Sequence, residues 1–340
     1  MTAAPTDLAS LLAKWGLPAD ARLAAADHGT NNQTFIVSID SPRFVLRISQ
    51  NLTADQVRAE QRLLARLRGA ALPFAVPEPR PTLTGEALVE TGAGPATLTA
   101  WLPGARPGLS GETALRHLGR TVGQLTQALA PVPPQDAPHN WRTALHVHAD
   151  VPDVGALGRD LRAAGVDPGL TRMLEAGAAE VDSSPVTGLP VQVVHGDLAA
   201  SNLLADERTG EITAVLDFEI AGLDARVHDF TNALKQCGAL EGPGWRQQVT
   251  AMADGYGSAQ QMTDTEAAAV PGLIREGLVN SVLWRAGRWR RGQAQLAEVT
   301  DRLRTLERTS GWLAACGDEL ADLLAAFALG GGSYWIGHAS

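Results

Sequence analysis

Val194-His195-Gly196-Asp197-Leu198-Ala199-Ala200-Ser201-Asn202 decides the fold of this chain, together with Asp217-Phe218-Glu219, which follows fifteen residues after the asparagine. A run rich in β-branched residues, Val191 to Val194, leads into the first segment and predicts a strand. Two short apolar runs, 203–204 and 212–216, flank a turn that ends in glycine, and this pattern predicts a hairpin. The sequence therefore predicts a strand, a loop and a hairpin in succession.

Three polar side chains stand at the ends of these elements. A hairpin of this length returns Asp217 toward Asp197 and Asn202, so we expect three oxygen-bearing groups to converge. Oxygen ligands with room left for water and phosphate suit Mg²⁺ better than Zn²⁺. These are the side chains that Mg²⁺-dependent phosphoryl transfer to a hydroxyl requires. We therefore expect Asp217 to be the main metal ligand and Asn202 a second, neutral one.

Asp197 has a different expected role, that of accepting the hydrogen bond of the substrate hydroxyl. The pKa of an ordinary aspartate carboxyl is about 3.9, so this group is too weak a base to ionise an alcohol outright. It is expected to orient the nucleophile and to take its proton late. His195, which precedes the Gly-Asp turn, is expected to be structural rather than catalytic.

The same run resembles the catalytic and metal-binding segments of the aminoglycoside phosphotransferase and choline kinase superfamily, above all its homoserine-kinase-type members. The resemblance implies an α+β, protein-kinase-like fold, with a small antiparallel N-terminal sheet lobe that carries one main helix and a larger, mostly helical C-terminal lobe. It implies ATP and Mg²⁺ as cofactors, Asp197 as the catalytic residue, and Asn202 and Asp217 as metal ligands. Positions 199–201 lack the Lys or Arg of many protein kinases, and Glu219 stands where those have Gly. Both departures favour small-molecule kinases.

A charged pair is expected in the N-terminal part. Thr53 and Gln56 form a capping-box pattern that predicts a helix over 54–68. Glu60 falls on the apolar face of this helix, and a charge that faces inward needs a partner. Arg47, on a predicted strand of the hairpin 35–48, is the candidate, and it resembles the strand cation of kinase-like folds that holds the nucleotide phosphates. An exposed arginine on a half-buried strand is the alternative.

The nucleotide is expected to contact two further segments. The segment 27–35 has a single glycine and resembles the Gly-x-x-Asn-x-Thr turn of the superfamily, although Asn and Gly are also ordinary turn residues. The expected organisation is a nucleotide-binding lobe over 1–98, a hinge over 99–104 that contacts adenine, and a catalytic and acceptor-binding lobe over 105–340. The candidate nucleotide contacts, besides Arg47 and Glu60, are Thr30, Asn32, Thr34, Thr99 and Trp101.

Beyond the hinge the pattern is mainly helical. Thr263 and Glu266 form a second capping box. By resemblance Asp229 braces the catalytic loop, while an ordinary aspartate at a helix start, favoured by the helix dipole, is the alternative. The helices predicted from apolar spacing cover 6–15, 54–68, 110–130, 154–164, 169–182, 225–238, 243–256, 264–287 and 293–328.

Composition excludes several classes of partner. The net charge of −9 and the pI near 5.4 argue against nucleic-acid binding. No apolar run approaches the roughly 18 residues that cross a bilayer, so we expect a cytoplasmic protein without membrane contact, either a monomer or a homodimer. Residues 103–340 hold 19 basic against 28 acidic residues, whereas residues 1–102 hold 9 of each. This acidic excess suits a cationic substrate, although a solvated acidic surface explains it as well.

Few residues indicate the identity of the acceptor, the molecule whose hydroxyl would receive the phosphoryl group. Arg285 and Arg288 lie on one side of a predicted helix and could hold a carboxylate, which favours an amino-acid alcohol such as homoserine, and Glu219 is a further candidate acceptor contact. Arginines at a helix end are also often only solvated. An aminoglycoside 3'-type phosphotransferase and an inactive kinase-fold binding module are alternatives. A third is a metal-dependent phosphoesterase that uses His195, Asp197, Asp217, His228 and Asp229.

Overall fold

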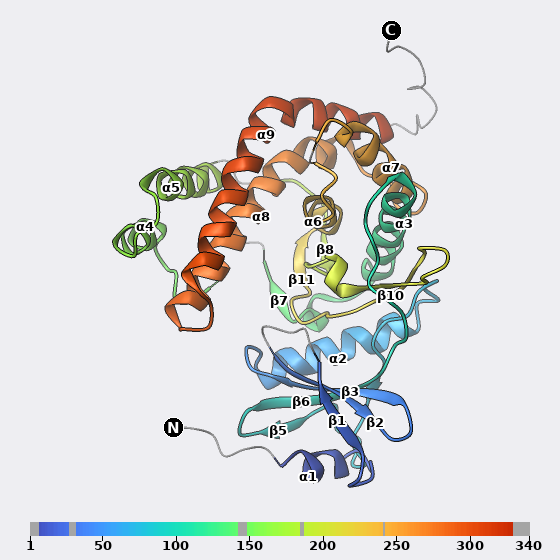
Figure 1. Cartoon of the computed structure of the whole chain (residues 1–340). Coiled ribbons are helices and arrows are strands. Elements are labelled where there is room, and N and C mark those ends of the chain that lie inside the picture. Colours follow the sequence, from blue (N-terminus) through green and yellow to red (C-terminus); the bar gives the residue numbers. More distant parts are fainter. Residues whose placement is uncertain (1–6, 27–31, 142–147, 184–186, 241, 329–340) are drawn as a thin grey trace. The chain divides into compact units, whose positions relative to one another are not determined.

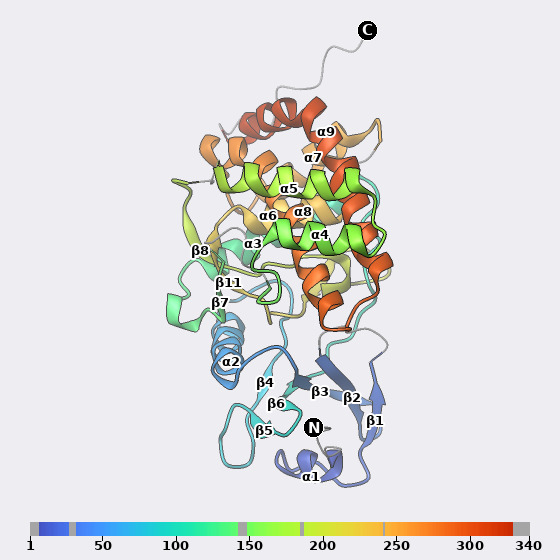
Figure 2. The ribbon, with the colours of Figure 1, turned by 90° about the vertical axis from the view of Figure 1, so that its left-hand side faces the viewer.

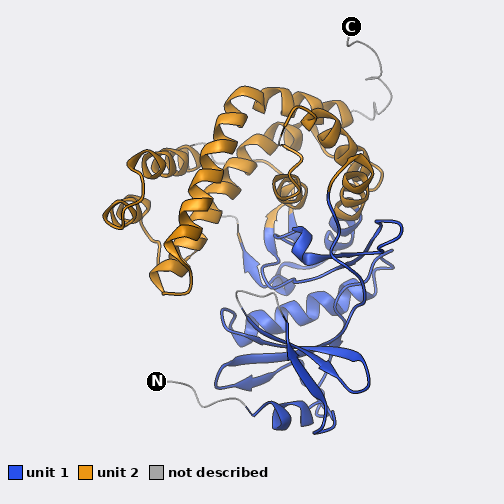
Figure 3. Cartoon of the chain, viewed as in Figure 1, with its two compact units in different colours: residues 1–109, 124–140, 192–223 blue, residues 110–123, 141–191, 224–340 orange. Residues whose placement is uncertain are grey.

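The computed structural model describes residues 7–26, 32–141, 148–183, 187–240 and 242–328. Contacts between Cα atoms divide the chain into two compact units, coloured in Figure 3. Unit 1 comprises residues 1–109, 124–140 and 192–223, and unit 2 comprises residues 110–123, 141–191 and 224–340. The two units follow a different border along the chain from the expected lobes at 1–98, 99–104 and 105–340. The unit division does not test those lobes, which stay a prediction.

Unit 1 contains a six-stranded antiparallel sheet in the order β1-β2-β3-β6-β4, with β5 paired to β6. The predicted hairpin is confirmed, and its register sets Thr34 opposite Arg47. Two strands of this sheet were not predicted: β1 has no β-branched residue, and β4 has only two residues. The strands are β1 Arg22–Ala25, β2 Asn32–Ser38, β3 Pro42–Ser49, β4 Pro79–Arg80, β5 Val89–Thr91 and β6 Gly94–Ala100.

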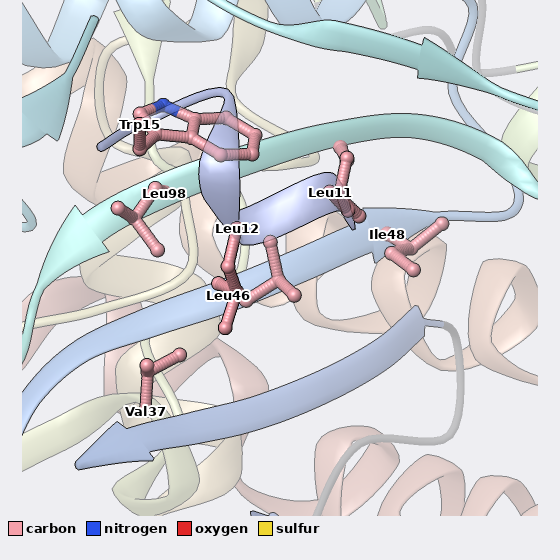
Figure 4. Packing of buried hydrophobic residues seen from close by; sticks show 8 residues of the cluster. Leu11, Leu12, Trp15, Val37, Leu46, Ile48 and Leu98 are labelled. Carbon is pink, nitrogen blue, oxygen red and sulfur yellow. The ribbon is translucent and has the colours of Figure 1, made fainter. Parts of the chain in front are cut away.

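The short helix α1, Leu8–Ala13, covers one face of this sheet (Figure 4). Leu46 and Ile48 of β3 are fully buried against it, as two-residue alternation along a strand requires. Arg47 between them therefore points to the other face. Figure 4 shows Leu11, Leu12 and Trp15 beside Val37, Leu46, Ile48 and Leu98 in this cluster.

The main helix of unit 1, α2 Ala54–Arg68, has the predicted bounds and the predicted capping box of Thr53 and Gln56. Its buried face carries Val57, Leu64 and Glu60, the last with 1% of its surface exposed. The inward carboxylate expected from the sequence is confirmed. A charge buried at this depth requires a positively charged partner.

The second half of unit 1 confirms the predicted strand, loop and hairpin. Strands β9, Leu203–Ala205, and β10, Ile212–Val215, pair antiparallel. The helix predicted from residue 225 begins later, because residues 222–225 form a strand that lies between two others. The remaining elements here are η1 Pro134–Asp136, β7 His139–Asn140, β8 Val191–Val194, η2 Ala200–Asn202 and β11 Gly222–Ala225, of which β8 and β11 run across the border between the units.

Unit 2 is built from helices, as predicted. Helices α8 and α9 pack along each other, and α4 lies beside α5 (Figures 1 and 2). None of the helices in the described ranges combines the length and the apolarity needed to cross a membrane. The helices are α3 Glu112–Leu129, whose last residues belong to unit 1, α4 Val154–Ala163, α5 Pro168–Ser183, α6 His228–Gln236, α7 Trp245–Gly257, α8 Asp264–Arg290 and α9 Leu296–Ala328.

Helices α3 and α7 approach closely within unit 2 because glycines meet backbone at their contact. A Cβ atom on Gly119 would lie 2.0 Å from the carbonyl oxygen of Met252, and one on Gly255 would lie 2.1 Å from that of Arg116. Real Cβ atoms do not approach oxygen so closely, so a side chain at either position forces the two helices apart.

We therefore expect Gly119→Ala to lower the free energy of unfolding by at least about 2 kcal/mol through overpacking. Gly311→Ala is the matched control, because Gly311 lies in α9 with nothing within 4 Å of its Cβ position. This control should stabilise the protein by about 0.5–1 kcal/mol through helix propensity. Denaturant unfolding measures both values, and a neutral Gly119→Ala would show that α3 and α7 can separate without cost.

Candidate active site

The catalytic loop begins where β8 delivers His195 into the interior. The His195 side chain is fully buried, and its ring meets that of Phe218 edge-on at 4.5 Å between centroids. The backbone N–H of Asp197 donates to Nδ1 at 3.2 Å, and Nε2 lies 2.9 Å from the carbonyl oxygen of Leu216. An amide can only donate and a carbonyl can only accept, so the ring is neutral with its hydrogen on Nε2. His195 thus links the loop to the strand before Asp217.

Asp197 and Asn202 form one hydrogen-bonded unit. The amide nitrogen Nδ2 of Asn202 donates to the main-chain oxygen of Asp197 at 2.9 Å and to its Oδ2 at 3.0 Å. The hydrogen bonds of Nδ2 fix the orientation of the Asn202 amide. Its Oδ1, the atom that can bind a cation, therefore points away from the Asp197 carboxylate.

Asp217 lies in a conformation and an environment that are both costly. Its φ is +62°, in the left-handed region that residues other than glycine uncommonly adopt, although asparagine and aspartate do so more often than most. Its side chain is 42% exposed, yet Oδ1 is buried, and no residue in the described ranges gives this oxygen a hydrogen bond. Burial and the neighbouring carboxylate of Glu219 raise the pKa of Asp217 to about 7, against the opposing effect of Arg47. An unsatisfied buried carboxylate oxygen of this kind fits a cation.

The expected pair of Arg47 and Glu60 is present. Nη2 of Arg47 donates to Oε2 of Glu60, and Nη1 lies 3.6 Å from Oδ1 of Asp217. Burial lowers the pKa of the Arg47 guanidinium, but Glu60 and Asp217 raise it by more, so the group stays charged. Strand β3 and helix α2 thus place one cation between a fully buried carboxylate and the candidate metal ligand.

Glu219 lies in the same cluster. Its side chain is buried, and Nδ2 of Asn32 on β2 donates to its Oε2. It also raises the pKa values of both Asp217 and Arg47. The sequence suggested Glu219 as an acceptor contact, and that role stays a prediction, whereas the neighbours given by the structure are the candidate nucleotide and metal residues.

The family of the chain follows from its sequence as a whole. Residues 22–268 match the model of the phosphotransferase enzyme family. The chain belongs to this family. It is a phosphotransferase that acts on hydroxyl groups, and the superfamily resemblance seen in the catalytic stretch is confirmed.

Similar proteins include the homoserine kinase of Xanthobacter autotrophicus, 26% identical over 293 residues that cover 84% of this chain and 86% of the relative. The homoserine kinase of Phenylobacterium zucineum is 26% identical over 83% of this chain and 85% of its own. Among solved structures, a microcompartment-associated aminopropanol kinase gives a TM-score of 0.64 at 18% identity, covering 95% of this chain and 99% of that one. A GDP complex of an aminoglycoside 2'-phosphotransferase gives 0.57 at 18%, covering 84% and 91%. These likenesses confirm the predicted kinase-like α+β fold.

Those remaining candidate nucleotide contacts of this phosphotransferase that the structure describes lie on β2, on β6 and just after β6. Thr30 lies outside the described residues. Thr34 and Thr99 are half-buried on β2 and β6, and Trp101 donates its backbone N–H to the carbonyl oxygen of Arg43 at 2.9 Å. Their roles stay predictions.

The candidate residues of unit 2 have partners of their own. Arg285 donates to Glu298 at 2.8 Å, and Arg288 is buried with 6% exposed. Asp229 is buried in the first turn of α6. Of the possible acceptor contacts predicted in this unit, Arg285 already has a carboxylate partner.

The two histidines of the phosphoesterase alternative have other partners. Both ring nitrogens of His195 have main-chain partners, and His228 pairs with Asp224 at 3.1 Å. Over the described ranges no three His, Cys, Asp or Glu side chains come together as a metal site. Mg²⁺, which keeps several waters and binds substrate phosphates, needs fewer protein ligands than such a cluster supplies.

Sequence reasoning missed three contributors to this site. These are Asp136, His139 and the contact of Asn32 with Glu219. His139 precedes the segment 142–147 in a region without helical or strand periodicity, so no local signal distinguishes it. Only the pairing of β7 with β11 brings it beside Glu219.

The raised pKa of Asp217 predicts how stability depends on pH in the absence of metal. The folded state keeps the Asp217 proton up to a pKa of about 7, whereas the unfolded chain loses it near 3.8. Stability should therefore fall as pH rises between these values. Asp217→Asn removes this fall and tolerates positive φ, so its melting temperature should exceed that of the wild type at pH 8 by more than at pH 4.

Asp206→Asn is the opposite control. Backbone N–H groups of Thr209 and Arg208 lower the pKa of Asp206, so its carboxylate contributes stability above the unfolded pKa that is lost as pH falls. Melting curves in EDTA measure both variants, Asp217→Asn across pH 4–8 and Asp206→Asn below the unfolded pKa of Asp206, 3.8. A constant difference between Asp217→Asn and the wild type over pH 4–8 would contradict the assigned environment of Asp217.

Proposed function

We propose that this phosphotransferase is an ATP-dependent small-molecule kinase that transfers the γ-phosphate of Mg-ATP to the hydroxyl of a small amino alcohol such as homoserine. The single observation that carries the proposal is the arrangement in unit 1 of Asp217, with an unsatisfied buried oxygen, beside Arg47. The catalytic loop of Asp197 and Asn202 is attached to the same segment, because the N–H of Leu216 donates to the main-chain oxygen of Asn202 at 2.8 Å.

The residues present fit a divalent cation. Asp217 and Asn202 would hold Mg²⁺ through Oδ1 of each side chain, and the raised pKa of Asp217 reflects a carboxylate that lacks enough compensating positive charge. When bound, Mg²⁺ supplies charge neutralisation for the phosphoryl oxygens. Among the structural relatives, an amicoumacin kinase was solved with AMP-PNP and Ca²⁺, which supports nucleotide and divalent-metal use here.

Arg47 is the proposed phosphate contact. Its Nη groups face carboxylates, while its Nε is buried and has no hydrogen-bond acceptor in the described part of the chain. A buried donor without an acceptor is costly, and a phosphate oxygen would satisfy it. Glu60 holds the guanidinium in place, and the register of β2 against β3 sets Thr34 beside it.

Asp197 is the proposed catalytic residue. One of its carboxylate oxygens, Oδ2, is engaged by Asn202, and this bond orients the group so that the other oxygen can accept the acceptor hydroxyl's hydrogen bond. The hydroxyl attacks the γ-phosphorus, the bond from that phosphorus to the bridging oxygen breaks, and Asp197 takes the hydroxyl proton late. ADP and a phosphate monoester are the products.

The amino-alcohol class is supported by the relatives. The curated relatives named above are homoserine kinases and one structural relative is an aminopropanol kinase, and both names describe alcohols that carry an amine. The acidic excess of residues 103–340, 28 against 19 basic residues, suits an ammonium group. An aminoglycoside is the second candidate, favoured by the structural relative that phosphorylates this class of antibiotic.

The test is ADP production from Mg-ATP with homoserine, 1-amino-2-propanol, choline and kanamycin as acceptors. We expect turnover with an amino alcohol, and Asp197→Asn should reduce kcat by at least about 100-fold, since a positioned acid–base group contributes that much. Leu198→Met, at the neighbouring buried position, is the folding control and should keep near-normal turnover. Turnover with kanamycin alone would move the chain to the antibiotic class, and normal turnover by Asp197→Asn would remove Asp197 from catalysis.

The phosphate role of Arg47 has its own test. Arg47→Gln combined with Glu60→Gln removes both buried charges together, so that neither is left unpaired. The KM for ATP should rise at least about tenfold, because a charge-assisted hydrogen bond is worth about 1.5–3 kcal/mol. Arg58→Gln, on the exposed side of α2, is the control and should leave KM unchanged. An unchanged KM in the double variant would show that Arg47 does not contact the phosphates.

A further inference from the structure

His139 lies between helix α2 and the segment that follows Asp217, within unit 1. Its Nδ1 is 3.3 Å from Nε2 of Gln56 at the start of α2, and its Nε2 is 3.0 Å from the main-chain oxygen of Glu219. The short strand β7 holds it there: the N–H of His139 donates to the carbonyl oxygen of Ala221 at 3.2 Å, and Gly222 pairs with it in register. One imidazole thus joins Gln56, 83 residues before it in the chain, to Glu219, 80 residues after it.

The atoms around His139 determine the direction of both hydrogen bonds. Oε1 of Gln56 accepts the N–H of Thr53 at 3.0 Å in the capping box, so the amide nitrogen of Gln56 is the atom that faces His139. That nitrogen can only donate, and the carbonyl of Glu219 can only accept. His139 therefore accepts at Nδ1 and donates from Nε2, which requires the neutral ring. Burial, which lowers the pKa of His139, favours the same state.

Helix α2 is held from a second side as well. The Asp136 carboxylate, buried with 3% exposed, accepts from Nε of Arg62 at 2.7 Å and from Nε of Arg66 at 2.6 Å. Gln56 precedes Glu60 by one helical turn and lies on the same side of the helix. The helix that carries the partner of Arg47 is therefore fixed near its start by His139 and on its other face by Asp136.

The segment on the other side of His139 needs such support. Asp217 has positive φ, and a sparsely populated backbone conformation persists only where the surrounding structure holds it. The Glu219 carbonyl that His139 binds is two residues from Asp217. A shift of this segment would move the Asp217 carboxylate away from Arg47.

We propose that His139 is a positioning residue, which fixes the main chain at Glu219 to helix α2 so that the Asp217 carboxylate and the Arg47–Glu60 pair keep their places relative to each other. The proposal rests on the proposed kinase function for its kinetic consequence. Its structural content, a hydrogen bond that restrains residues 217–219, can be measured without turnover.

Two amide substitutions separate the two hydrogen bonds of His139. The side-chain nitrogen of glutamine reaches about as far as Nε2, so His139→Gln keeps a donor for the Glu219 carbonyl. Asparagine reaches only about as far as Nδ1, so His139→Asn keeps a partner for Gln56 and loses the bond to Glu219. We expect kcat with Mg-ATP to fall about 10–100-fold in His139→Asn, as for other groups that orient site residues, and to stay within about threefold in His139→Gln.

Amide hydrogen exchange supplies the readout that does not depend on activity. Peptides that cover residues 216–221 should exchange at least about tenfold faster in His139→Asn and at the wild-type rate in His139→Gln. The proposal would be overturned if the two variants had equal exchange rates and equal kcat values. It would also be overturned if both variants lost kcat to the same extent and that loss matched a fall in melting temperature. If the wild type phosphorylates no acceptor, the proposed function fails, and the exchange result alone decides the role of His139.

Discussion

The ion pair of Arg47 and Glu60 is the constraint on which the candidate site depends. The side chains are 16% and 1% exposed, and either charge alone would be costly at this depth, because removal from water without a partner forfeits hydration. The pair therefore ties strand β3 to helix α2 in one arrangement. Held in this way, Arg47 comes within 3.6 Å of Asp217, and the proposed phosphate and metal contacts follow from that placement.

Besides Glu60, helix α2 supplies several other residues that contact the candidate site. Glu60 holds Arg47, Gln56 reaches the Glu219 segment through His139, and Arg62 and Arg66 share Asp136. The cost of the arrangement is concentrated at Asp217, which combines positive φ with an oxygen that lacks a hydrogen bond. Strain and an unsatisfied group of this kind are expected where a ligand is to bind. The network around α2 is what keeps that residue in place.

Local signals in the sequence correctly predicted several of the helices and strands that form the fold. The capping boxes at Thr53 and Thr263, the helix 54–68 and the hairpin after Asn202 were all found, because their determinants lie within a few residues of one another. Strand β1 was not predicted because it has no β-branched residue, whereas β4, β7 and β11 were not predicted because they are two to four residues long and pair with strands that are not their neighbours in the sequence. The helix start predicted at residue 225 was wrong for the same reason, since β11 takes residues 222–225 into a sheet.

The sequence by itself determined the chemistry: the spacing of Asp197, Asn202 and Asp217, and an inward Glu60 that required a cation, follow from residue types and short-range periodicity. Only the tertiary structure decided which groups surround them. The contact of Asn32 with Glu219 spans 187 residues, and the hydrogen bond of His139 to the same residue spans 80. Such contacts depend on strand pairing and register, which no local pattern encodes, because the energy that selects them comes from packing the whole unit.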